Sequence, residues 1–119
     1  MILKITLNNK VYHANMLDIP LVNQILNMCP FELKYQISQE HEYYASLPKS
    51  TDAKGSKLES KAKKNQIWFF AEWNAFCFIF NDCDVSPWKI IHLGDFEEDI
   101  SEELKKSPSY INVKCELDK

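Results

Sequence analysis

Residues 67–80 read IWFFAEWNAFCFIF, and this stretch decides the fold. Two short runs rich in aromatic residues, 67–70 and 76–80, lie on either side of a turn near residues 72–74. Short apolar runs bounded by turn-forming residues are typical of buried strands. The stretch therefore predicts an antiparallel hairpin that carries aromatic side chains on both of its faces.

The rest of the chain shows the alternation that is typical of half-buried strands. Apolar and polar residues alternate with a period of two in residues 3–7, 31–37 and 111–117. Asn8-Asn9 follows the first of these segments and predicts a tight turn, because Asn tolerates positive φ. Shorter strands are expected at residues 10–16, 42–46 and 88–93.

One helix is expected over residues 18–29, where it would plug one end of a barrel or cover a sheet face. Asp18 is its predicted N-cap and Pro20 suits its first turn. Apolar residues recur in this segment at helical spacing. Pro30 ends the helix, because a proline ring cannot continue the helical hydrogen bonds.

Two further features lie between the predicted strands. A brief helix is expected after Gly94, where Asp95 and Glu98 resemble a capping box. Residues 47–65 form a long polar loop with six lysines. A connection of this length is functional, mobile, or contains a short strand near residues 57–59.

Length and composition indicate one globular domain over residues 1–119. Its 45% hydrophobic content is enough to bury a core without disulfides. The chain enters a strand directly after Met1, and no apolar run approaches the roughly 20 residues that span a bilayer. We therefore expect a cytoplasmic protein without a membrane partner.

The charge of the chain argues against a nucleic-acid partner. The net charge is −3, and all 14 basic residues are lysine. Bidentate recognition of guanine or phosphate usually depends on the guanidinium group of arginine, which lysine cannot copy. We expect no binding to nucleic acid.

The residue types that usually carry catalysis or metals do not cluster in the sequence. The four cysteines lack C-x-x-C spacing and are interpreted as buried, inert thiols. The three histidines form no metal-binding pair, and Glu40-His41-Glu42 is interpreted as the solvated start of a strand. The sequence has no G-x-S-x-G motif and too few glycines for a phosphate loop. We predict no catalytic residue, no metal and no organic cofactor.

Six short motifs follow one another in a characteristic order. They are Asp18-Ile19-Pro20, Cys29-Pro30, Glu42-Tyr43-Tyr44, Leu47-Pro48, Phe78-Ile79-Phe80 and Leu93-Gly94. With this order, the sequence resembles the cyclophilin-like family of small bacterial proteins over about residues 1–105. The Gly-Asp of that family appears here as Lys64-Asn65, so the sharp turn into the hairpin is made differently, with Asn65 as the candidate.

The resemblance implies a mostly β fold, a closed antiparallel cyclophilin-like barrel with one covering helix, and the chain's own pattern adds one short C-terminal helix. It implies no settled activity, although the best-known relatives by fold are proline isomerases. In true cyclophilins an arginine in a hydrophobic groove donates a hydrogen bond to the imide nitrogen. This chain has no arginine.

The aromatic residues are the main indication of a site. They exceed what one core of this size needs, so the second face of the hairpin is either covered by the helix or offers an apolar groove. Trp88, Ile90 and His92 share a strand face that belongs either to the core or to such a groove. Glu42 is the polar residue of interest, because the resemblance places an acid there. The predicted ligand-binding residues are Glu42, Tyr44, Trp68, Phe70, Phe78, Phe80, Trp88 and His92.

The sequence thus predicts a non-catalytic domain that binds a small apolar ligand or an extended peptide in an aromatic groove. Two alternatives stay open. One is a weak peptidyl-prolyl cis-trans isomerase that lacks the usual arginine. The other is a protein-interaction module or homodimer joined through an exposed aromatic face.

Overall fold

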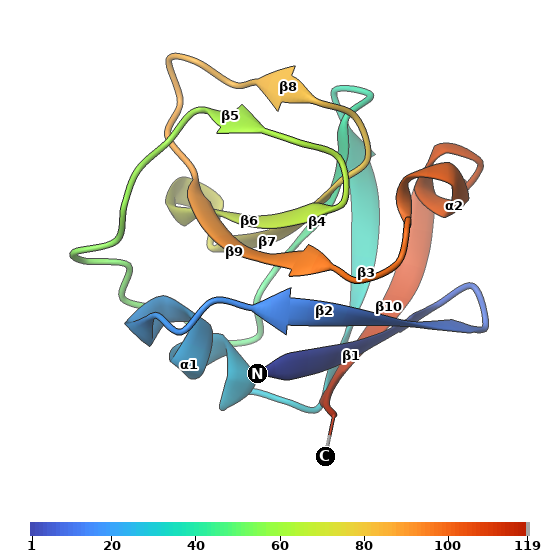
Figure 1. The fold of residues 1–119 in the computed structure, drawn as a ribbon, viewed down its shortest axis with the longest axis horizontal. Coiled ribbons are helices and arrows are strands. Elements are labelled where there is room, and N and C mark those ends of the chain that lie inside the picture. The colour runs from blue at the N-terminus through green and yellow to red at the C-terminus, as the bar shows by residue number, and fades with distance from the viewer. Residues whose placement is uncertain (119) are drawn as a thin grey trace.

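The aromatic hairpin is part of a closed barrel in the computed structural model, which describes residues 1–118. The barrel strands are β1 (Ile2–Leu7), β2 (Lys10–Met16), β3 (Phe31–Ser38), β4 (Glu42–Ser46), β6 (Gln66–Phe70), β7 (Ala75–Ile79), β9 (Ile91–Phe96) and β10 (Tyr110–Leu117). They close in the order β1-β10-β3-β4-β7-β6-β9-β2, with antiparallel neighbours throughout (Figure 1).

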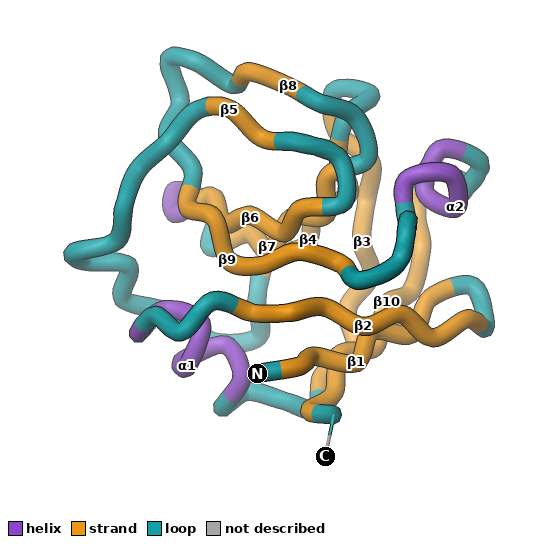
Figure 2. Tube along the Cα trace, viewed as in Figure 1, coloured by secondary structure: helices purple, strands orange, loops and turns teal. Residues whose placement is uncertain are grey.

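Five shorter elements complete the described chain (Figure 2). They are α1 (Pro20–Leu26), β5 (Lys61–Ala62), the 3-10 turn η1 (Ala71–Trp73), β8 (Cys83–Asp84) and α2 (Ser101–Lys105). The predicted fold class is therefore confirmed: a closed antiparallel barrel with one covering helix and one short helix near the C-terminus. Neither helix of the described residues is long and apolar enough to cross a membrane.

The inner face of the hairpin forms the centre of the barrel core. Ile67 pairs with Phe78 and Phe69 pairs with Phe76 across β6 and β7, and all four side chains are buried in the main apolar cluster. The Phe78 ring stacks on Tyr35 at 4.7 Å between ring centroids. Close packing of such large rings supplies much of the apolar burial that stabilises the fold.

The outer face of the same hairpin is also largely buried, but not by the helix. Buried residues of α1 pack into the main cluster inside the barrel, so the alternative in which the helix predicted at residues 18–29 covers this face is wrong. Trp68 and Cys77 instead join a second apolar cluster with Ala62 and Ile90. We call residues 59–62 and 83–90 the outer arm.

The outer arm is a narrow two-stranded extension that lies over the barrel wall. β5 pairs with β8 through Lys61 and Ala62, and an isolated bridge joins Glu59 to Ile90. Figure 1 shows β5 and β8 beyond β6 and β9, at the top of the view. The long lysine-rich loop thus contains a short strand, at residues 61–62 rather than near 57–59.

Local sequence rules account for the start of α1. Asp18 does not cap the helix, because the N-cap is Ile19, whose backbone is extended at φ −133 and ψ 154. A residue before proline is driven into this extended region, and Pro20 at the first helical position needs no amide acceptor. The helix ends at Leu26, earlier than the predicted residue 29.

The capping box predicted at Asp95 and Glu98 is also wrong. Asp95 lies within β9, opposite Asn15 of β2 and Gln66 of β6, so the strand predicted at residues 88–93 is shifted to residues 91–96. The Glu98 carboxylate accepts hydrogen bonds from the backbone N–H of His13 at 2.8 Å and pairs with its Nδ1 at 3.0 Å. Asp95 is therefore part of a strand and Glu98 binds a residue of β2, so the two do not form a capping box.

The cysteines are free thiols, but only two of the four are buried as predicted. Cys77 and Cys115 are buried and Cys29 and Cys83 are half-buried, and none of the four, all of which lie within the described residues, forms a disulfide. Burial raises the pKa of Cys29 and of Cys83 to about 11. These thiols are therefore protonated at neutral pH, which makes them weak nucleophiles.

Asn65 makes the turn that enters the hairpin, as predicted. Its φ is +71, in the left-handed region that Asn tolerates better than other non-glycine residues. Its N–H donates to the carbonyl of Ile79, and its carbonyl accepts from Phe96. Its side-chain Oδ1 accepts from the amides of Ile100 and Ser101 at 2.9 and 3.1 Å, which fixes the start of α2.

We expect Asn65→Ala to lower the free energy of unfolding by about 2 kcal/mol, in roughly equal parts from backbone strain and from the two lost amide acceptors. Asn65→Gly relieves the strain but not the loss of acceptors, so it should cost only about 1 kcal/mol. Urea unfolding monitored by circular dichroism measures both. Equal costs for the two variants would show that backbone strain contributes nothing at this turn.

Candidate functional site

A pocket of about 660 Å³ opens on the outer face of the hairpin, beside the outer arm. Its lining residues come from β4, β6, η1, β7, β8 and the connections next to them. We call it the aromatic pocket because four large rings line it: Trp68, Phe70, Trp73 and Trp88. Its volume lies within the roughly 300–1,000 Å³ that small-molecule sites occupy.

The aromatic walls are arranged around Phe70. The Phe70 ring meets Trp73 at 5.0 Å and Trp88 at 6.0 Å between centroids, with interplanar angles of 83° and 82°. Trp68 is buried beneath them, whereas Trp73 and Trp88 remain 54% and 58% exposed. The two exposed indoles therefore stand nearly perpendicular to the ring between them.

Short turns hold the two exposed tryptophans in place. Trp73 ends η1, and the next residue, Asn74, adopts a positive φ of 49 and donates its side-chain amide to the Lys49 carbonyl. Trp88 follows a turn in which the Asp84 carboxylate accepts hydrogen bonds from the N–H and the hydroxyl of Ser86. Such side-chain contacts to a nearby backbone are typical of Asx turns.

The floor of the pocket consists of three largely buried side chains, those of His41, Glu42 and Cys77. Glu42 begins β4 and pairs with Ile79 of β7. Its Oε1 lies 3.7 Å from the Nε2 of His41, and the two side chains are only 18% and 14% exposed. The His41 Nε2 is buried and finds no hydrogen-bond partner among the described residues.

Burial shifts the pKa values of two side chains at the floor, Glu42 and Cys77. It raises the pKa of Glu42, while the charge of His41 and a hydrogen bond with Cys77 oppose that rise. Burial, reinforced by the neighbouring Glu42 carboxylate, also raises the pKa of the Cys77 thiol well above its usual value. A carboxyl group held in this environment favours a positively charged or hydrogen-bonding partner.

With this geometry established, comparison with known proteins assigns a family. Residues 5–116 match the model of the cyclophilin-like family. The chain belongs to this family. The fold is also similar to the solution structure of the hypothetical protein AF2241 from Archaeoglobus fulgidus. The TM-score is 0.77 and the identity 15%, and the likeness covers 98% of this chain and 93% of that one. At this identity the likeness shows the fold alone. The comparison with curated proteins finds no match.

Four of the eight predicted ligand-binding residues line the aromatic pocket of this cyclophilin-like barrel: Glu42, Trp68, Phe70 and Trp88. Tyr44 lies beside it on β4, hydrogen-bonded to Gln36, with its ring 5.4 Å from that of Trp73. The structure does not bring Phe78 and Phe80 to the pocket, because both are buried inside the barrel. They alternate with outward residues such as Cys77 and Ile79, so they face the core.

His92 lies outside the barrel core and beyond Trp68, on which its ring stacks at 4.9 Å. Its Nε2 is 3.0 Å from the Gly94 carbonyl and 3.2 Å from the Asp95 carboxylate. Of the two alternatives, the core position is therefore wrong.

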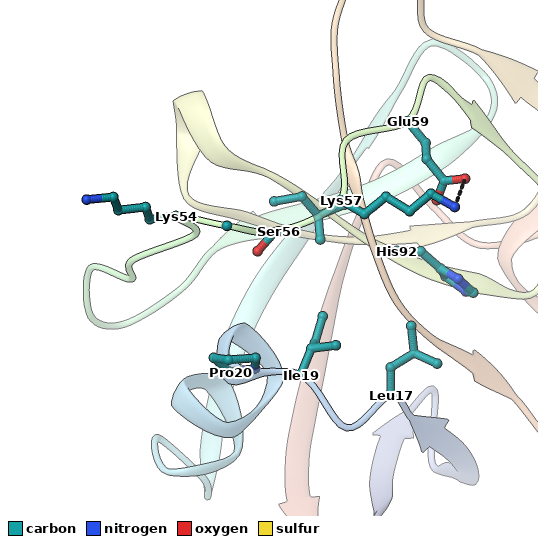
Figure 3. Close-up of a pocket in the computed structure, with 10 residues that line it drawn as sticks. Leu17, Ile19, Pro20, Lys54, Ser56, Lys57, Glu59 and His92 are labelled. Atoms are coloured by element: carbon teal, nitrogen blue, oxygen red, sulfur yellow. Dashed lines mark ion pairs between the residues drawn. The ribbon is translucent and has the colours of Figure 1, made fainter.

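His92 contributes instead to a second pocket of about 450 Å³, between the lysine-rich loop and the start of α1 (Figure 3). Figure 3 shows the Lys57 side chain reaching the Glu59 carboxylate, at 3.7 Å, while Lys54 points away from the cavity. This exposed pair is worth little energetically. The side chains of Lys57 and Glu59 are 84% and 39% exposed, whereas those of His41 and Glu42 in the aromatic pocket are largely buried, so we do not take the second pocket as the candidate site.

Several residues of the aromatic pocket are absent from the set predicted from the sequence. His41 was interpreted as solvated, and this is wrong, because the tight turn at Gln39 and Glu40, both with positive φ, folds it against the barrel wall. Trp73 lies in the predicted hairpin turn. Because turns lie at the surface of a protein, an aromatic side chain at this position could have been expected to be exposed. Asp84 precedes Ser86-Pro87, a turn-forming pattern that indicates a fixed carboxylate. Among residues 1–118, no group of three or more His, Cys, Asp or Glu side chains is placed to hold a metal ion.

We expect Glu42→Gln to stabilise the protein at neutral pH but not at acid pH. The pKa of Glu42 is raised in the folded state, so the native protein binds more protons than the unfolded chain and loses stability as the pH rises through that pKa. Glutamine does not titrate and escapes this loss. Below pH ~4, Glu42 is largely protonated in both the folded and the unfolded wild type. Wild type and variant should therefore have similar stability there.

Thermal unfolding from pH 4 to pH 8 measures this difference. Glu32→Gln, an exposed strand glutamate on β3, is the matched control and should show no such trend. A Glu42→Gln variant that becomes progressively less stable than wild type with rising pH would show that pairing with His41 outweighs the cost of burial.

Proposed function

We propose that this cyclophilin-like domain binds a small ligand with an apolar body in the aromatic pocket. The eight barrel strands are all paired, so the described barrel offers no free strand edge to an extended peptide. A peptide would have to bind through its side chains alone. A small molecule suits a pocket of about 660 Å³ better.

One observation carries the proposal: two tryptophan side chains in contact with Phe70 remain more than half exposed, at a pocket of ligand size. Burying an aromatic ring is strongly favourable, so a folded domain normally covers such rings with its own chain. Contiguous exposed apolar surface next to a cavity marks a recognition site. The ligand would complete the burial that the outer arm leaves unfinished.

We favour binding over peptidyl-prolyl isomerisation because of the chemistry that isomerisation needs. Rotation about the peptide bond faces a barrier of ~18–20 kcal/mol, and catalysis depends on a directed donor to the imide nitrogen. The sequence has no arginine, and none of the lysines among residues 1–118 lines the aromatic pocket. The donor role therefore has no arginine or lysine candidate in the described pocket.

Binding can be tested with N-phenyl-1-naphthylamine, a neutral apolar dye whose fluorescence rises in apolar surroundings. We expect saturable binding by the wild type and about tenfold weaker binding by Trp88→Ala, because one wall of the pocket is removed. Tyr110→Ala is the control, since Tyr110 is 56% exposed on β10 and does not line the pocket. Equal losses in both variants would contradict the proposal.

Light scattering on the same samples separates ligand binding from self-association. A monomer at all concentrations is expected. A wild-type dimer that Trp88→Ala converts to a monomer would show that the exposed rings form an interface between copies of the chain, and the proposal of a ligand site would fall.

A further inference from the structure

Apart from the titratable His41, the ionisable side chains that line the aromatic pocket are three carboxylic acids and the buried thiol of Cys77. The three acids are Glu42, Glu72 and Asp84. The chain has 14 lysines, yet within residues 1–118 none of them lines this pocket. The second pocket, by contrast, is lined by Lys54 and Lys57. The aromatic pocket is therefore selectively negative, in a chain with many lysines available.

The three carboxylates lie at different depths. Glu42 is at the largely buried floor, whereas Glu72 and Asp84 are exposed at the rim. Hydrogen bonds from Ser86 lower the pKa of Asp84 and keep its carboxylate charged at neutral pH. Rim charges of this kind raise the local concentration of cations and guide them toward the floor.

The floor offers an acceptor that the chain itself leaves unused. The buried Nε2 of His41 lacks a hydrogen-bond partner among the described residues and lies 3.7 Å from the Glu42 carboxylate. In the tautomer that carries its proton on Nδ1, this nitrogen accepts a hydrogen bond. A buried polar atom without a partner is costly, so a donor here is favourable.

The aromatic walls suit the same kind of ligand. The faces of aromatic rings carry negative electrostatic potential and attract cations, most strongly in tryptophan. Trp73 and Trp88 stand nearly perpendicular to Phe70, at 83° and 82°, and all three rings line the pocket together with Glu42. Aromatic rings combined with a carboxylate are a recurrent arrangement for organic ammonium groups.

We propose that the ligand of the aromatic pocket is a small organic cation, a primary ammonium group carried on an apolar body. The ammonium donates to the Glu42 carboxylate, beside the buried His41 Nε2, and the apolar body packs against Phe70, Trp73 and Trp88. This inference rests on the proposed function, because it names the chemical class of the ligand at the same site.

Three probes of one shape and different charge test it by isothermal titration calorimetry: phenethylamine, phenethyl alcohol and hydrocinnamate. At pH 7 we expect phenethylamine, as the ammonium, to bind about tenfold more tightly than the neutral alcohol, and the anionic hydrocinnamate to bind most weakly. Equal affinities for amine and alcohol would overturn the cation inference and leave the binding site intact. Failure of all three probes, and of the neutral dye, would overturn both proposals.

Variants of the floor and rim carboxylates show which carboxylate binds the ammonium group. Glu42→Gln should weaken phenethylamine by about tenfold and leave phenethyl alcohol unchanged within about twofold. Glu32→Gln removes the same charge from β3, outside the pocket, and should change neither affinity. Loss of amine binding in both variants would show a general charge effect and overturn the assignment to Glu42.

A rim variant keeps the test independent of how Glu42→Gln folds. Glu72 is exposed in η1, so Glu72→Gln leaves the barrel intact and should weaken phenethylamine by about threefold, with no effect on the alcohol. Phenethylamine affinities equal to that of the wild type in both Glu72→Gln and Glu42→Gln would contradict the inference.

Discussion

The structure depends on the need to bury both faces of one hairpin. Strands β6 and β7 place aromatic residues inward, into the barrel core, and a second apolar set outward. Closing the barrel satisfies only the inner face. The outer arm satisfies the outer face in part, through Ala62 and Ile90, and leaves the rings near η1 uncovered. The aromatic pocket is what remains between the arm and the wall.

Most of the barrel could be predicted from sequence because the strand period is a local signal. The strands predicted at residues 31–37, 42–46 and 111–117 lie within one residue of the observed ones. The Asn8-Asn9 turn has φ of 50 and 62, as a residue type tolerant of positive φ predicts. Errors occurred where two local rules competed. The preference of Asp for the N-cap predicts Asp18, but the extended backbone required before Pro20 makes Ile19 the N-cap.

The structure explains why the Leu93-Gly94 motif has glycine at its second position, which the sequence alone does not reveal. A Cβ atom at this position would come within 2.5 Å of the Asn15 carbonyl and 2.8 Å of the Met16 sulfur. Strand β9 passes close to β2 there, opposite the irregular register between Ile67 and Trp68 of β6. Only glycine permits this approach without displacement of the backbone. The Leu93-Gly94 motif thus marks a closure point of the barrel.

The site was only partly predictable, because its parts belong to different kinds of structure. Alternation correctly places Trp68 and Phe70 on one face, but it cannot tell which face of the hairpin is the inside of a closed barrel, and Phe78 and Phe80 proved to be core residues. The outer arm pairs segments more than twenty residues apart, Lys61 with Asp84, and no local pattern encodes that contact. The cover of the outer face was assigned to the wrong element for this reason.

The floor and the walls of the pocket are consequently under different constraints. Tyr43 and Glu42 are neighbours on β4, so a slip of one residue against β7 would exchange a buried tyrosine for a carboxylate inside the core. The apolar core therefore fixes the position of the floor carboxylate as strictly as it fixes the fold. Trp73 and Trp88 lie on turns and have few buried contacts, so their substitution changes the shape of the pocket at little cost in stability. Under the proposed function, the turns set which ligand body fits, while the position of the floor carboxylate stays tied to the register of the strands.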